Sequence, residues 1–143
     1  MDPDREPELG DLIEISRDGY QHWAIYVGNG YVIHLVKDSD TGAKGTVKKE
    51  KLKDVVGKDK YQINNHLDKI YVPHPTEDIL QKAISYVEEK FPYNMASSNC
   101  EHFVTLLRYG KPHSQQVQNA KNLLLAAVVF KILKLATLKK ERE

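Results

Sequence analysis

The chain has 143 residues, of which 41% are hydrophobic and 29% are charged, and its formal net charge at pH 7 is +1. These values predict one soluble globular domain; they exclude a disordered chain and give no overall reason to expect a nucleic-acid partner. The single cysteine, Cys100, excludes an internal disulfide framework and a cysteine-rich zinc site. The first residues are acidic and contain no apolar run typical of a secretory signal, so we expect a cytoplasmic protein.

The first half of the chain has the pattern of β-strands separated by turn residues. A first strand is predicted over residues 10–16. The strongest hairpin signal is Gly28-Asn29-Gly30, flanked by β-rich runs over residues 20–27 and 31–36. After a polar loop over residues 37–46, weaker strands are predicted over residues 47–51 and 61–64, with one helical turn between them over residues 52–57.

Two helices are predicted in the second half. Thr76 is expected to cap the first, whose apolar stripe comprises Ile79, Leu80, Ala83, Ile84, Val87 and Phe91. In the second, Ser98 is the expected N-cap and Glu101 completes an S-x-x-E capping box. This helix is expected to end near Gly110.

Cys100 falls in the first turn of the second helix. Unpaired backbone N–H groups and the positive end of the helix dipole favour an anion there, so the sequence predicts a lowered thiol pKa. Apolar residues recur at offsets of three, four and seven from Cys100, which turns the sulfur toward the core sheet. A lone cysteine is more often a small buried hydrophobe, but the capping box and two histidines upstream favour a nucleophile.

Those histidines, His22 and His34, belong to the two hairpin strands. A two-residue loop would place His34 opposite Ile25 and the two imidazoles on opposite faces, because side chains alternate along a strand. A three-residue loop places His34 opposite Ala24, and the imidazoles then share a face as diagonal neighbours about 7 to 8 Å apart. We predict the register of the three-residue loop, a common hairpin type in which a glycine in the left-handed conformation forms a bulge.

These residues fit the logic of a thiol nucleophile, a base and an orienting group, with Cys100, His22 and His34 in those roles. A neutral imidazole can orient another because it both donates and accepts hydrogen bonds. Metal binding by the same three residues is a less favoured alternative. His102 lies roughly 200° around the helix from Cys100. His66, His74 and His113 are expected to be surface residues.

Several segments carry a family resemblance: Gly10-Asp-Leu-Ile-Glu-Ile, His22-Trp-Ala-Ile-Tyr-Val-Gly28, Gly30-Tyr-Val-Ile-His-Leu35, Asn99-Cys-Glu-His-Phe-Val104 and Leu107-Arg-Tyr-Gly110. They resemble the phospholipase A and acyltransferase proteins, also called the H-Ras-like suppressor family, which belong with lecithin:retinol acyltransferase. The resemblance covers about residues 6–112. Its H-box around His22 and NC-box around Cys100 are specific when they occur together.

The resemblance implies an α+β fold of the circularly permuted papain-like (NlpC-type) kind, in which an antiparallel sheet packs against helices and the histidine strands precede the nucleophile helix. It assigns Cys100 as nucleophile, His22 as base and His34 as third member. The implied reaction takes an acyl chain from a glycerophospholipid through a Cys100 thioester. Water, the amine of phosphatidylethanolamine or a lysophospholipid then accepts the chain. No metal or other cofactor is needed, and we expect a monomer.

The C-terminal part departs from the family, whose members usually end in an uninterrupted apolar anchor. Residues 123–138 are apolar but contain Lys131 and Lys134, and the segment is shorter than the roughly 20 residues of a spanning helix. A helix lying at the membrane surface is slightly favoured over a span or a helix packed on its own domain. We therefore predict a catalytic domain over residues 1–112 and a membrane-associated helix within residues 113–143.

A different class of function remains open beside catalysis. Picornaviruses carry proteins with the same H-box and NC-box that can act by recruiting partners or altering membranes. Under this alternative the chain is a non-catalytic protein that binds membranes or host proteins.

Overall fold

The computed structural model describes residues 5–39, 42–94 and 99–114. The chain divides into two units, Met1–His113 and Ser114–Glu143. The predicted C-terminal helix with residues 123–138 lies outside the described residues, and the predicted domain boundary stays a prediction. Within the described ranges, no helix is both long and apolar enough to cross a bilayer.

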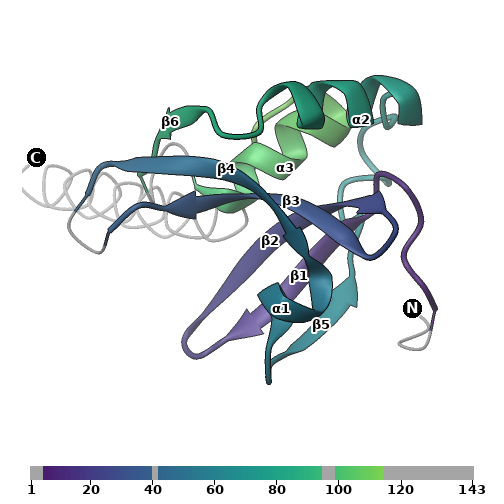
Figure 1. Cartoon of the computed structure of the whole chain (residues 1–143). Helices are drawn as coiled ribbons and strands as arrows, with labels where there is room; N and C mark the ends of the chain where they lie inside the picture. The colour runs from purple at the N-terminus through teal and green to yellow at the C-terminus, as the bar shows by residue number, and fades with distance from the viewer. Residues whose placement is uncertain (1–4, 40–41, 95–98, 115–143) are drawn as a thin grey trace, which may run out of the picture. The chain divides into compact units, whose positions relative to one another are not determined.

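A six-stranded sheet forms the framework of the first unit (Figure 1). Its strands lie in the order β5-β1-β2-β3-β4-β6, and each neighbouring pair is antiparallel. The strands are β1 Leu12–Arg17, β2 Tyr20–Gly28, β3 Tyr31–Lys37, β4 Lys44–Lys51, β5 Lys60–Ile63 and β6 Lys90–Pro92. The predicted α+β class with an antiparallel sheet is confirmed.

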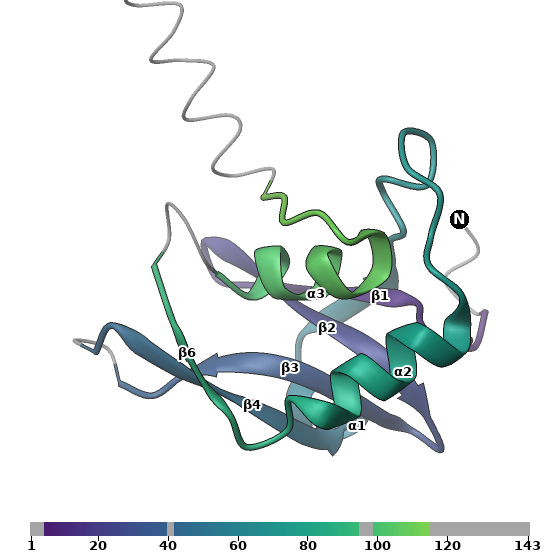
Figure 2. The ribbon, with the colours of Figure 1, turned by 90° about the horizontal axis from the view of Figure 1, so that it is seen from above.

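Helices cover both faces of this sheet. The two longer helices, α2 (Thr76–Ser85) and α3 (Cys100–Tyr109), lie over one face, as Figure 2 shows from above, and the short α1 (Leu52–Val56) lies on the other. Alternation along the strands supplies both cores, since Ile25 packs in the cluster with α3 and Ala24 in the cluster with α1. Strand β2 is therefore buried on both sides.

Helix α2 is shorter than its apolar pattern predicts. Pro75 is the N-cap and Thr76 the first helical residue, so the predicted Thr76 cap is wrong. The helix ends at Ser85, and Ile84 is 57% exposed. At Glu88 the backbone turns into the left-handed region, and the Glu88 N–H then donates to the Val47 carbonyl of β4. This turn starts β6, so Phe91 reaches the core from a strand instead of from the helix.

Candidate functional site

The cap of α3 differs by one residue from the prediction. Asn99 is the N-cap, and its side-chain oxygen accepts from the backbone N–H groups of Glu101 at 2.9 Å and His102 at 3.1 Å. His102 Nδ1 accepts from the Asn99 N–H at 3.0 Å and so plays the part predicted for Glu101. A neutral imidazole nitrogen can do this because it carries a lone pair. Cys100 is thus the first residue of the helix.

The Cys100 thiol is buried where α3 meets β2. The backbone N–H of Trp23 and the hydroxyl of Tyr93 both donate to the sulfur, which favours the thiolate. Burial has the larger effect and raises the pKa of the Cys100 thiol above its ordinary value. The predicted lowering is therefore wrong for the free protein, because desolvation outweighs the helix start and its donors.

Tyr93 is a site residue that the sequence did not reveal. Its hydroxyl oxygen also accepts from the backbone N–H of Cys100, and burial raises the pKa of the Tyr93 hydroxyl. Tyr93 follows β6, a three-residue strand too short to show alternating hydrophobicity. No local signal placed it beside the start of α3.

The β2–β3 hairpin brings His22 and His34 onto one face in the predicted register. Gly28 pairs with Tyr31, whereas the prediction paired Val27 with Tyr31, so two residues instead of three lie between the strands. The pairing then shifts, and Ile25 pairs with Ile33. The extra residue, Val27, forms a bulge that turns the strand by one position. It restores the register in which the histidines share a face, and that part of the prediction is confirmed.

The two imidazoles form a direct pair. His22 Nε2 lies 2.7 Å from His34 Nδ1, and the ring centroids are 5.0 Å apart at 76°. Burial lowers the pKa of His22 to about 3, with smaller contributions from the charges of His34 and Arg17. Burial also lowers the pKa of His34, against the opposing effect of Glu50. Both rings are therefore neutral near pH 7.

Glu50 on β4 determines which of the two imidazoles donates the hydrogen bond between them. Its Oε2 lies 3.4 Å from His34 Nε2, and a carboxylate there favours a hydrogen on that nitrogen. His34 Nδ1 then accepts from the Nε2–H of His22, which leaves the lone pair of His22 on Nδ1. No sequence pattern singled out Glu50, since it lies in a charged run of a weakly predicted strand.

The structure places the thiol and the imidazole pair next to the same peptide but not in direct contact. Alternation puts His22 on the side of β2 that carries Ala24 and α1, whereas Cys100 packs in the cluster on the α3 side. The N–H that reaches the sulfur belongs to the peptide between His22 and Trp23. His22 branches from the Cα attached to that peptide.

The neutral His22 predicts a loss of stability in mild acid. The ring titrates near 6.5 when unfolded but near 3 when folded, so below pH 6.5 the unfolded chain binds a proton that the folded one does not. Between pH 7 and pH 5 the free energy of unfolding should fall by about 2 kcal/mol from His22 alone. Denaturant unfolding of the wild type and His22→Gln at both pH values measures this. Equal losses in the two proteins would contradict it.

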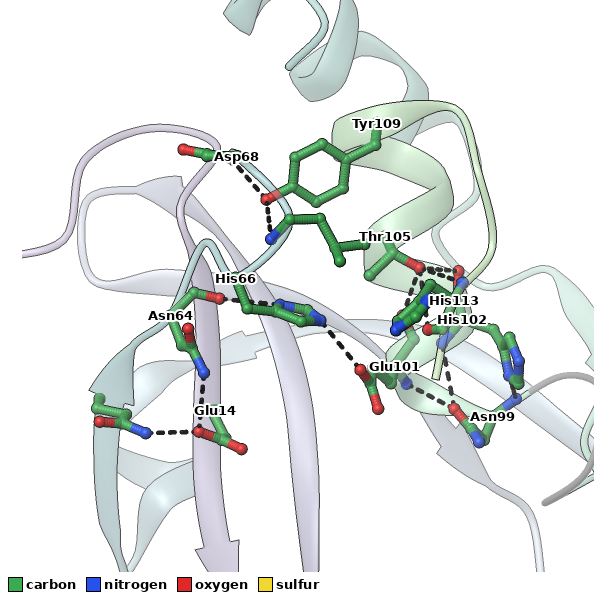
Figure 3. Close-up of polar contacts among 12 residues, drawn as sticks. Glu14, Asn64, His66, Asp68, Asn99, Glu101, His102, Thr105, Tyr109 and His113 are labelled. Carbon is green, nitrogen blue, oxygen red and sulfur yellow. Dashed lines mark hydrogen bonds and ion pairs between the residues drawn. The ribbon is translucent and has the colours of Figure 1, made fainter. Parts of the chain in front are cut away.

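Two of the three histidines predicted to be surface residues have a different environment. His66 and His113 are half-buried, and His66 Nε2 lies 3.1 Å from the buried carboxylate of Glu101 (Figure 3). The surface prediction is wrong for both because the loop after β5 and the segment after α3 meet at the start of α3. His74 is exposed, as predicted.

A groove of about 680 Å³ lies elsewhere on the first unit, between the N-terminal segment, the hairpin turn and α1. Arg5, Tyr26, Lys51 and Tyr61 are among the residues that line it. None of the three candidate catalytic residues does, so this groove is separate from the thiol and the histidine pair.

Comparisons with known proteins agree with the resemblance seen in the motifs. The model of the family described as lecithin retinol acyltransferase matches residues 5–113. Phospholipase A and acyltransferase 4 of Homo sapiens is 47% identical over 94% of this chain and 89% of that protein. Phospholipase A and acyltransferase 3 of Mus musculus is 50% identical over 82% of this chain and 80% of that protein. Phospholipase A and acyltransferase 2 of Homo sapiens is 46% identical over 96% of each.

Proposed function

We propose, from the premise that this chain belongs to the lecithin retinol acyltransferase family, that it is a phospholipid-modifying enzyme with phospholipase A and acyltransferase activity. The names of its relatives support this class of activity. The observation that carries the assignment of residues is the 2.7 Å contact between His22 and His34 beside the peptide that donates to the Cys100 sulfur. Cys100 is the nucleophile, His22 the base and His34 the orienting group.

In the first half-reaction the Cys100 sulfur attacks the ester carbonyl of a glycerophospholipid. His22 Nδ1, which holds the lone pair, accepts the thiol proton as the carbon–sulfur bond forms. This step requires the imidazole to turn toward the sulfur. The ester carbon–oxygen bond then breaks, and the same proton passes to the departing lysophospholipid oxygen.

In the second half-reaction an acceptor cleaves the thioester. Water gives a free fatty acid, the amine of phosphatidylethanolamine gives an N-acylated lipid, and the hydroxyl of a lysophospholipid gives a diacyl lipid. Each acceptor loses one proton to His22, which returns it to the sulfur. The buried setting of the thiol supports a two-step route, since it shields the thioester from bulk water.

The order of elements along the chain supports a circularly permuted papain-like arrangement. The strands that carry His22 and His34 precede the helix that starts at Cys100. We extend the proposal to the membrane, because residues 123–138 are apolar and followed by Lys139, Lys140 and Arg142. Such a segment can lie on an anionic surface and hold a cytoplasmic monomer at its lipid substrate.

Vesicles of labelled phosphatidylcholine test the proposed function. The wild-type chain should release lysophosphatidylcholine, and intact mass spectrometry should find one acyl group added to the protein. Peptide mapping should place that group on Cys100, and hydroxylamine should remove it because it is a thioester. Addition of unlabelled phosphatidylethanolamine or lysophospholipid should divert label from fatty acid into lipid.

Vesicle sedimentation provides the control for this assay. If the protein sediments with vesicles but yields neither lysolipid nor an acyl adduct, catalysis is contradicted and the non-catalytic binding function is favoured. An acyl adduct that survives hydroxylamine would contradict the thioester.

A further inference from the structure

His66, Glu101 and His113 form a cluster of potential metal ligands outside the proposed catalytic residues. One ligand atom from each of the three lies within 4.8 Å of the other two. In Figure 3 the His66 ring and the Glu101 carboxylate point toward one another, with His113 at the same end of α3. From this cluster we propose a binding site for one Zn²⁺ ion.

The spacing of the cluster suits a small cation. Zinc binds imidazole nitrogen and carboxylate oxygen at about 2.0 to 2.2 Å, so ligand atoms of a tetrahedral site lie roughly 3.3 Å apart. The His66 Nε2 to Glu101 Oε2 distance is already 3.1 Å. The rings of His66 and His113 are 5.9 Å apart between centroids, so small side-chain movements complete the site.

The hydrogen-bond partners of His66 are compatible with its Nε2 acting as a metal ligand. Its Nδ1 lies 3.4 Å from the Asn64 carbonyl, and its Nε2 faces the Glu101 carboxylate. A neutral imidazole has one N–H, which can serve only one of these two acceptors. A cation bound to Nε2 and the carboxylate leaves the hydrogen on Nδ1 for Asn64. Such an outer hydrogen bond is the usual partner of a metal-bound histidine.

His113 provides a second, independent observation that points to a ligand. Its Nε2 is buried and, among the described residues, has no hydrogen-bond partner. A buried polar nitrogen left in this state costs about 1 to 3 kcal/mol. A Zn²⁺ ion coordinated by this nitrogen would remove that cost.

The backbone around the cluster is held in place by the fully buried Thr105. Its hydroxyl accepts from the His113 N–H at 2.8 Å and lies 3.0 Å from the Glu101 carbonyl. The loop that carries His66 is also attached to α3, because Tyr109 and Arg108 of α3 both donate hydrogen bonds to the carboxylate of Asp68 in that loop. Three chain segments therefore present their ligands before a metal arrives, which lowers the ordering cost of binding.

Two histidines and one carboxylate favour Zn²⁺ over Mg²⁺ or Ca²⁺, which prefer oxygen ligands. Glu101 follows Cys100 directly, but its side chain points to His66 while the thiol contacts Trp23 and Tyr93. The ion would thus join the loop after β5, the start of α3 and the segment after α3. Its role is to fix the base of the nucleophile helix, separate from the acyl chemistry.

The full-length chain, freed of metal with a chelator, tests the site. Calorimetric titration with Zn²⁺ should give one ion per chain with a Kd of about 10 μM or tighter, and Zn²⁺ should raise Tm. His66→Gln and His113→Gln should each weaken binding by at least about tenfold. Co²⁺ should give the visible bands of a tetrahedral site without a sulfur charge-transfer band.

Matched variants separate this site from other ligands. His74→Gln removes an exposed histidine, and Cys100→Ser removes the thiol; both should bind Zn²⁺ as tightly as the wild type. Circular dichroism of the metal-free variants establishes that they are folded. The proposal is overturned by a wild-type Kd weaker than about 100 μM, by unchanged affinity in folded His66→Gln, or by loss of binding in Cys100→Ser. None of these outcomes depends on acyl transfer, so the site and the proposed function fail separately.

Discussion

Cys100→Ser should lower kcat/KM for lysophospholipid release by about 10³-fold or more. The serine hydroxyl differs from the thiol by one atom and fits the same buried position, but it is a far weaker nucleophile at neutral pH. The substitution therefore removes chemistry with little change in packing. The measurement is initial rate on labelled phosphatidylcholine vesicles, together with intact mass after reaction. No acyl adduct should form on the variant.

The His74→Gln variant serves as the control, because His74 is exposed and distant in the fold from the thiol's contacts. It should keep wild-type activity. Cys100→Ser with more than about a tenth of wild-type activity would eliminate Cys100 as the nucleophile. Equal vesicle binding by both variants is needed to assign the loss to chemistry.

His22→Gln should lower kcat by about 10² to 10⁴-fold with little change in KM. Glutamine can still donate from its amide to His34 Nδ1, so the contact at 2.7 Å has a replacement, but the base on Nδ1 is lost. The expected loss falls on kcat because the base acts during bond formation. Steady-state kinetics with phosphatidylcholine vesicles measures the two constants separately.

His34→Gln is the matched comparison for His22→Gln. The role of His34 is to position His22, so kcat should fall less in His34→Gln than in His22→Gln, by about 10 to 100-fold. In the double variant Cys100→Ser with His22→Gln, activity should be lower by less than the product of the two single-variant losses, because the two residues act as a unit. A larger loss in His34→Gln than in His22→Gln would reverse their roles. Additive losses in the double variant would contradict a shared step.

Local patterns in the sequence predicted much of the fold. The alternating runs of β2 and β3, the turn residues between them and the apolar positions of α3 each report which side of an element is buried. These signals depend on residues that are near neighbours along the chain, so they can be read from the sequence without knowledge of the fold. The left-handed Gly110 likewise marked the end of α3.

The register of the hairpin depended on more than its loop. The two-residue turn has Asn29 and Gly30 at positive φ, and by itself it predicts imidazoles on opposite faces. The bulge at Val27 reverses this outcome. Gly28 has positive φ, which a bulge of this kind favours, and pairing with β1 and β3 buries the apolar residues on either side.

The sequence by itself identified the candidates for nucleophile and base, and it predicted the elements that carry them. Only the tertiary structure decided their environment. Burial under α3 raises the pKa of the Cys100 thiol, and burial lowers that of His22, because desolvation depends on residues distant in the sequence. The meeting of His66, Glu101 and His113 has the same origin, since three separate segments converge only when the chain folds.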